Sequence, residues 1–162
     1  MLKLLLATPD KLRRIADKIA FLGPALARLT IGVVFIQTGW GKLHSLGDVT
    51  EFFASLHIPA PAFQARLAAG TELFGGVLVL IGLATRLASL PLAFTMMVAI
   101  ATAKRGDLTG VSALLGLEEW SYLVFFVWLA LAGAGSLSVD GLIARRRGRI
   151  ETPGRQDAKS GF

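Results

Sequence analysis

The stretch GTELFGGVLVLIG, from Gly70 to Gly82, decides the fold, because a carboxylate at Glu72 is followed directly by ten apolar residues. In water such a run would form a core helix with one solvated end. In a bilayer the Glu72 carboxylate would be costly and would need a partner inside the protein. The medium that surrounds the chain therefore determines how Glu72 must be interpreted.

The composition favours the bilayer. The 162-residue chain is long enough for one domain, and it is 54% hydrophobic and only 17% charged, well below the roughly 25% charged residues of soluble domains. Residues 87–103 and 120–139 contain no charged residue. Such runs approach the roughly 17–25 residues with which a helix crosses the hydrocarbon core. A soluble chain could hide one helix of this kind but not several, so we expect an integral membrane protein.

Four apolar segments predict an all-α fold, a four-helix transmembrane bundle. The helices are expected at about 24–43, 67–85, 87–103 and 120–137. A tight turn around Arg86 makes the second and third helices antiparallel neighbours. The membrane domain covers 24–143, and a short amphipathic helix at 1–23 is expected either in the interface or packed on protein. Residues 104–119 either lie in the outer interface or re-enter the bundle, and 144–162 form a basic, polar tail that ends disordered.

Basic residues predict the orientation. Thirteen of the 17 Lys and Arg residues lie in the N-terminal flank, in the C-terminal tail or in the turn at Arg86, and four lie in the other connections. The positive-inside rule then places both chain ends in the cytoplasm, as an even number of spans requires. Basic clusters beside membrane segments are typical of contacts with anionic lipid rather than nucleic acid. The sequence contains no cysteine, which excludes disulfides and thiol chemistry on this chain.

Two stripes of residues predict which helix faces meet. On the first helix the stripe consists of Arg28, Gly32, Phe35, Gly39 and Lys42. On the second helix it consists of Glu72, Gly75, Gly76, Val79, Leu83 and Arg86. At about 100° per residue each set lies on one face, and both faces should point into the bundle. The four glycines of the stripes would let neighbouring backbones approach closely.

The charged residues of these stripes predict two clusters at different depths. Lys42 and Glu72 should meet at similar height, so that Glu72 forms half of an ion pair and lines a small polar pocket. Gln37 is a further candidate for this pocket, although it lies roughly opposite the stripe of the first helix. At the other end of the bundle, three charged residues form a structural frame that we call the Asp140 cluster: Arg28, Arg86 and Asp140.

Metal and nucleotide chemistry are not favoured. His44 and His57 are the two histidines of the sequence, and both fall in the connection between the first and second helices. With Asp48 and Glu51 nearby a metal site is conceivable, but histidines in loops are more often simply solvated, so no metal is expected. The sequence has no pair of in-helix histidines for a haem, no glycine-rich phosphate loop and no serine elbow.

Four segments resemble, in sequence and in order, the DoxX family of small bacterial membrane proteins. They are ARLTIGVVFIQTGWGKL, IPAPAF, AGTELFGGVLVLIGLATR and GAGSLSVDGLI, within about residues 25–143. The residues that match the family's motifs are Arg28, Gly32, Gly39, Lys42, Glu72, Gly75, Gly76, Gly82, Arg86, Gly133, Gly135, Ser138 and Asp140. The resemblance implies a four-helix bundle in the bacterial inner membrane.

The resemblance also implies a class of function. The DoxX family is similar to the membrane subunit of thiosulfate:quinone oxidoreductase, and other members are linked to complexes that handle thiol and oxidative stress. This chain would then be a quinone-facing or anchoring subunit, and a partner protein would bring the redox centre, because the sequence has no cysteine and no evident haem site. Quinone is the expected ligand, and membrane lipid surrounds the chain. The sequence leaves open transport or binding of a small solute or proton, a non-catalytic assembly role, and a homo-oligomer.

Overall fold

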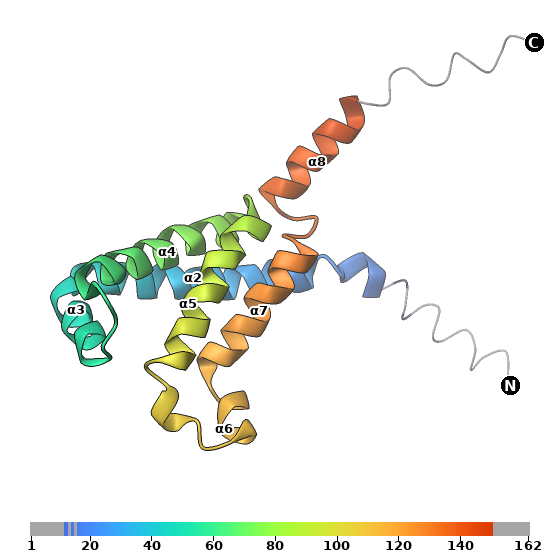
Figure 1. Ribbon diagram of the computed structural model, residues 1–162. Coiled ribbons are helices and arrows are strands. Elements are labelled where there is room, and N and C mark those ends of the chain that lie inside the picture. Colours follow the sequence, from blue (N-terminus) through green and yellow to red (C-terminus); the bar gives the residue numbers. More distant parts are fainter. Residues whose placement is uncertain (1–11, 13, 15, 151–162) are drawn as a thin grey trace, which may run out of the picture.

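The protein is all-helical over the residues that the computed structural model describes, which are 12, 14 and 16–150 (Figure 1). This confirms the predicted fold class. The main helices are α2 (Leu22–His44), α4 (Pro61–Ile81), α5 (Thr85–Ala101) and α7 (Glu118–Ala132). The shorter elements are α3 (Leu46–Ser55), a 3₁₀ helix (Arg105–Asp107), α6 (Val111–Leu115) and α8 (Val139–Ile150).

The four main helices form two pairs that cross. α2 packs along α4, α5 packs along α7, and Figure 1 shows the second pair running at a steep angle across the first. The core lies at the crossing, where the Phe35 ring of α2 meets the edges of Tyr122 and Phe126 of α7 with centroids 5.3 and 4.8 Å apart. Val79 of α4 and Leu92 of α5 are fully buried in the same core, and Tyr122 packs against it partly buried.

The outer surface of the bundle suits lipid rather than water. Large apolar side chains on every main helix remain exposed, including Leu29, Phe74, Phe94 and Leu131. By length and composition, the helical segment Ala16–His44 and α4 can each cross a membrane, and α5 is a shorter apolar helix. Contiguous apolar surface of this extent is rare on soluble monomers.

The ends of several helices differ from the prediction. α4 begins at Pro61 rather than at residue 67, because proline suits the first helical position and precedes an uninterrupted helical run. It ends at Gly82, whose φ of 71° is left-handed, so the turn to α5 spans residues 82–84 and Arg86 belongs to α5. α7 stops at Ala132 rather than at residue 137, because Gly133 takes a φ of 83°.

The connections carry more helix than the sequence predicted. The link between α2 and α4 contains α3, which packs on α4. The predicted tail is helical up to residue 150, where α8 ends. Residues 1–11 of the predicted interfacial segment and residues 151–162 of the predicted disordered tail lie outside the described residues. The described part of that first segment is helical at 16–19, and its Leu12 and Ile19 side chains are exposed.

Candidate functional site

Glycines bring α2 and α4 close enough to bury a charged pair. A Cβ atom added at Gly32 would stand 2.7 Å from the Cβ of Leu80, and one at Gly76 would stand 2.8 Å from the backbone N of Ile36. Gly39 sits equally tightly against the backbone of α4. Gly75 faces α5 instead, where an added Cβ would meet Leu92. These close approaches leave little space for water between α2 and α4.

The pair itself consists of Lys42 on α2 and Glu72 on α4, and we call it the ion-pair site. Lys42 Nζ lies 2.5 Å from Glu72 Oε1 and donates a hydrogen bond to it. The Glu72 side chain is 4% exposed and that of Lys42 is 34% exposed. Glu72 stands near the middle of α4, nine residues before its end at Ile81, which is about 14 Å along the axis. A carboxylate at this depth needs a counter-charge, and Lys42 supplies it.

One oxygen of Glu72 remains available for chemistry. Oε2 is buried and has no hydrogen-bond partner among the described residues. A carboxylate oxygen accepts hydrogen bonds, and leaving a buried acceptor unpaired is costly. Lys42, whose side chain is partly exposed, bonds to the other oxygen, Oε1. The ion-pair site therefore combines a paired and an unpaired carboxylate oxygen within one buried side chain.

The structure does not bring Gln37 to this pair. Its side chain is exposed on α2, while the Gly39 and Lys42 positions of the same helix face α4. The reason is the helical period, because five residues from Gln37 to Lys42 turn the side-chain direction by about 140°. Gln37 thus lies outside the ion-pair site.

The residues of the Asp140 cluster lie at the other end of the bundle, but the hydrogen bonds that they make there are to backbone groups. Asp140 accepts hydrogen bonds from the backbone N–H groups of Ala84, at 2.8 Å on Oδ1, and Thr85, at 3.0 Å on Oδ2. It thereby caps the start of α5. The buried Arg28 donates through Nη2 to the backbone carbonyl of Leu137. Within the described part of the chain, neither arginine of this cluster lies within salt-bridge distance of a carboxylate.

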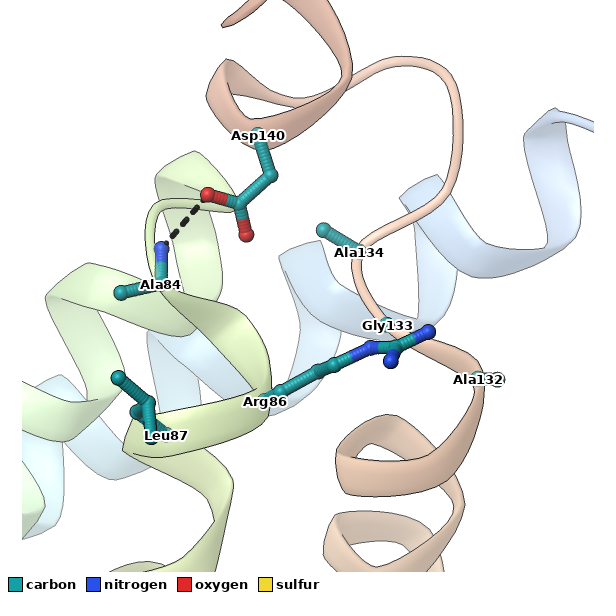
Figure 2. A pocket seen from close by; sticks show the side chains of 7 residues that line it. All are labelled: Ala84, Arg86, Leu87, Ala132, Gly133, Ala134 and Asp140. Atoms are coloured by element: carbon teal, nitrogen blue, oxygen red, sulfur yellow. Dashed lines mark hydrogen bonds between the residues drawn. The ribbon is translucent and has the colours of Figure 1, made fainter. Parts of the chain in front are cut away.

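A shallow pocket of about 360 Å³ lies beside this cluster, between the start of α5, the end of α7 and the start of α8. Figure 2 shows the Arg86 side chain extending toward Gly133, while Asp140 reaches Ala84 from the opposite wall. The remaining lining residues are Leu87, Ala132 and Ala134. This pocket is separate from the ion-pair site.

The two histidines have different surroundings. His44 Nδ1 lies 2.9 Å from the backbone carbonyl oxygen of Trp40, and its ring lies against the Trp40 indole at a tilt of 46°. His57 is exposed after α3. Over residues 12, 14 and 16–150, no group of three or more His, Cys, Asp or Glu side chains is arranged to hold a metal ion.

Two features of the structure, helix α8 and a second ion pair, were not predicted from the sequence. Ser138 directly precedes α8, and its Oγ accepts a hydrogen bond from Gly141 N at 2.9 Å. The serine three residues before Gly141 is an N-cap signal that could have revealed α8. Lys104 and Glu119 form a second ion pair at 3.6 Å, which ties the ends of the connection between α5 and α7.

The fold and the buried pair define a helical membrane protein with charged groups enclosed between its helices. The DoxX family profile matches residues 23–105. A Bacillus subtilis protein named "Putative oxidoreductase CatD" is 35% identical over 74% of this chain and 85% of its own length. The Escherichia coli "Inner membrane protein YqjF" is 28% identical over 80% of this chain and 98% of its length. No solved structure matches.

The chain belongs to the DoxX family. The Mycobacterium tuberculosis protein named "Uncharacterized membrane protein Rv3486" is a further relative, 33% identical over 74% of this chain and 80% of its length. The resemblance found in the sequence is thereby confirmed, and the protein is a membrane protein surrounded by lipid.

Proposed function

We propose that this protein is a quinone-facing or anchoring subunit of a membrane redox system, with the ion-pair site as the contact for quinone. The observation that carries the proposal is the buried Glu72 Oε2, an acceptor with no partner among the described residues. A quinol hydroxyl would donate to this oxygen, and the Lys42 ammonium would donate to a quinone carbonyl. The relative named as an oxidoreductase supports a redox role.

The protein's own part in such a reaction is binding and proton handling. Reduction of a quinone takes two electrons and two protons, and the chain has no cysteine to carry electrons as a thiol. A partner redox protein would therefore deliver the electrons. Glu72 would receive or release a proton at Oε2, and Lys42 would balance the charge that changes beside it.

The test is quinone retention by the protein purified with native lipid. We expect wild type to retain quinone and Glu72→Gln to bind it about tenfold more weakly, because the amide places an N–H donor or a neutral oxygen where the carboxylate accepts. Glu51→Gln on the exposed surface of α3 is the matched control and should bind as wild type does. Wild type without quinone, together with unchanged titration of Glu72→Gln, would refute the proposal. Solute or proton flux through liposomes that depends on Glu72 would favour transport instead.

We further propose that the protein lies in the bacterial inner membrane with both chain ends in the cytoplasm. The support is the excess of basic residues at those ends and the name of the Escherichia coli relative. Because the chain has no cysteine, single cysteines can be labelled without background. Ser55→Cys on α3 should react with an impermeant maleimide in intact spheroplasts, whereas Ala144→Cys on α8 should react only after lysis. The reverse pattern would contradict this orientation.

A further inference from the structure

The pocket beside the Asp140 cluster carries one charged side chain of each sign on its walls. Arg86 is exposed and makes no hydrogen bond to any described residue. A guanidinium has five N–H donors in a planar fork that matches phosphate oxygens. Its side chain lies over Gly133, where an added Cβ would stand 3.1 Å from Arg86 Nε. The pocket therefore presents a cation with unused hydrogen-bond donors.

Asp140 retains acceptor capacity on the opposite wall. Each of its two oxygens accepts one backbone N–H, from Ala84 and from Thr85. A carboxylate oxygen has about two acceptor sites, so each oxygen can take one further hydrogen bond. Figure 2 shows the Asp140 carboxylate and the Arg86 guanidinium on different sides of the pocket and apart from each other. A ligand that carries both charges can therefore contact each group separately.

The surroundings of the pocket suit a lipid. It lies where α5 begins and α7 ends, which is the level of the membrane interface for helices that cross a bilayer. Leu87 lines the pocket and is 71% exposed, and Leu131, beside the lining residue Ala132, is 75% exposed. Both leucine side chains are exposed on the apolar outer surface of the bundle. Arg145 and Arg146 are exposed on α8, where they attract the phosphate layer of the membrane.

We propose that this pocket binds the phosphoethanolamine headgroup of a membrane phospholipid. The phosphate contacts the guanidinium of Arg86, the ammonium donates to the free acceptor sites of Asp140, and the acyl chains run past Leu87 and Leu131. A purely anionic headgroup would meet the Asp140 carboxylate without a compensating charge, and a quaternary choline has no N–H to donate. The proposal does not depend on the quinone function, because it concerns the other end of the bundle.

The experiment is native mass spectrometry of the full chain in detergent with equal amounts of phosphatidylethanolamine, phosphatidylcholine and phosphatidylglycerol. We expect wild type to retain phosphatidylethanolamine at least about tenfold better than the other two. Arg86→Gln should remove this preference and Arg86→Lys should restore part of it. Arg66→Gln is the matched control, since Arg66 is exposed on α4 away from the pocket.

A further variant tests the ammonium contact. Asp140→Asn keeps one acceptor for the start of α5 but loses the negative charge. This variant should therefore bind phosphatidylglycerol and phosphatidylethanolamine equally. Its melting temperature checks that it is folded. Equal retention of all three lipids by wild type, or an equal loss in Arg66→Gln and Arg86→Gln, would overturn the proposal. Competition by soluble glycerophosphoethanolamine as potent as that of the lipid would overturn the assignment to a lipid.

Discussion

Replacing Gly39 by alanine should weaken the α2–α4 pair. The added Cβ would stand 2.8 Å from the Cα of Leu73 and 2.9 Å from the backbone oxygen of Ala69. Both obstacles are backbone atoms, so no side-chain rotation can relieve the contact. The backbone N of Leu73 lies closer still to the added Cβ, and ordinary van der Waals contact begins at 3.4 Å, so the two helices must separate by at least about 0.6 Å. A gap of 0.5–1 Å forfeits roughly a quarter to a half of each dispersion contact across it.

The expected cost of this change is about 1–3 kcal/mol, the usual range for overpacking a tight interface. Gly41→Ala is the matched control on the same helix, because nothing lies within 4 Å of its added Cβ. Both variants gain the same helix propensity of up to about 1 kcal/mol, so their difference isolates the packing term. The free energy of unfolding can be measured in mixed micelles by titration with sodium dodecyl sulfate. Equal stability of the two variants would refute close backbone contact at Gly39.

Three further changes test the charged groups. Glu72→Ala should lower the free energy of unfolding by about 1–3 kcal/mol, less than for a fully buried pair because Lys42 is one-third exposed. Changing both Glu72 and Lys42 to methionine should recover most of this loss. A double variant as unstable as Glu72→Ala would count against this reasoning. Asp140→Ala removes the cap of α5 and should cost about 1 kcal/mol, with faster hydrogen exchange at the start of α5; unchanged exchange there would contradict the cap. Arg28→Met leaves the Leu137 carbonyl without its donor and should speed exchange over residues 133–138, and wild-type protection of that segment would argue against the bond.

Helical periodicity explains why the α2–α4 contact could be predicted. The spacing of Gly32 and Gly39 places both on one face, and the structure sets that face against α4. The meeting of Lys42 and Glu72 required only that α2 and α4 lie side by side and run in opposite directions. Both inferences depend on residues within one helix pair, where period and chain direction determine depth.

The other end of the bundle could not be derived in the same way. Asp140 bonds to Ala84 and Thr85, more than 50 residues away, and the donors are backbone groups that any residue would offer. Ala84 itself takes a left-handed φ of 47°, a conformation that an alanine in the sequence does not predict. The boundary of α5 is thus a property of the tertiary fold. The steep crossing of the two helix pairs likewise depends on side-chain shapes at Phe35 and Phe126 rather than on a pattern.

The charged residues at the two ends of the bundle have different kinds of partner. This difference distinguishes residues that define the fold from residues that are candidates for chemistry. At the Asp140 cluster, Asp140 bonds to backbone groups at the start of α5 and Arg28 bonds to the carbonyl of Leu137, so removing either side chain should alter the fold. At the ion-pair site the charges satisfy each other, and no backbone turn depends on them. A protein that needed only a packed core could replace such a pair by apolar residues without loss. The buried Glu72 with its unpartnered oxygen is therefore the feature from which we propose a ligand or a proton at this site.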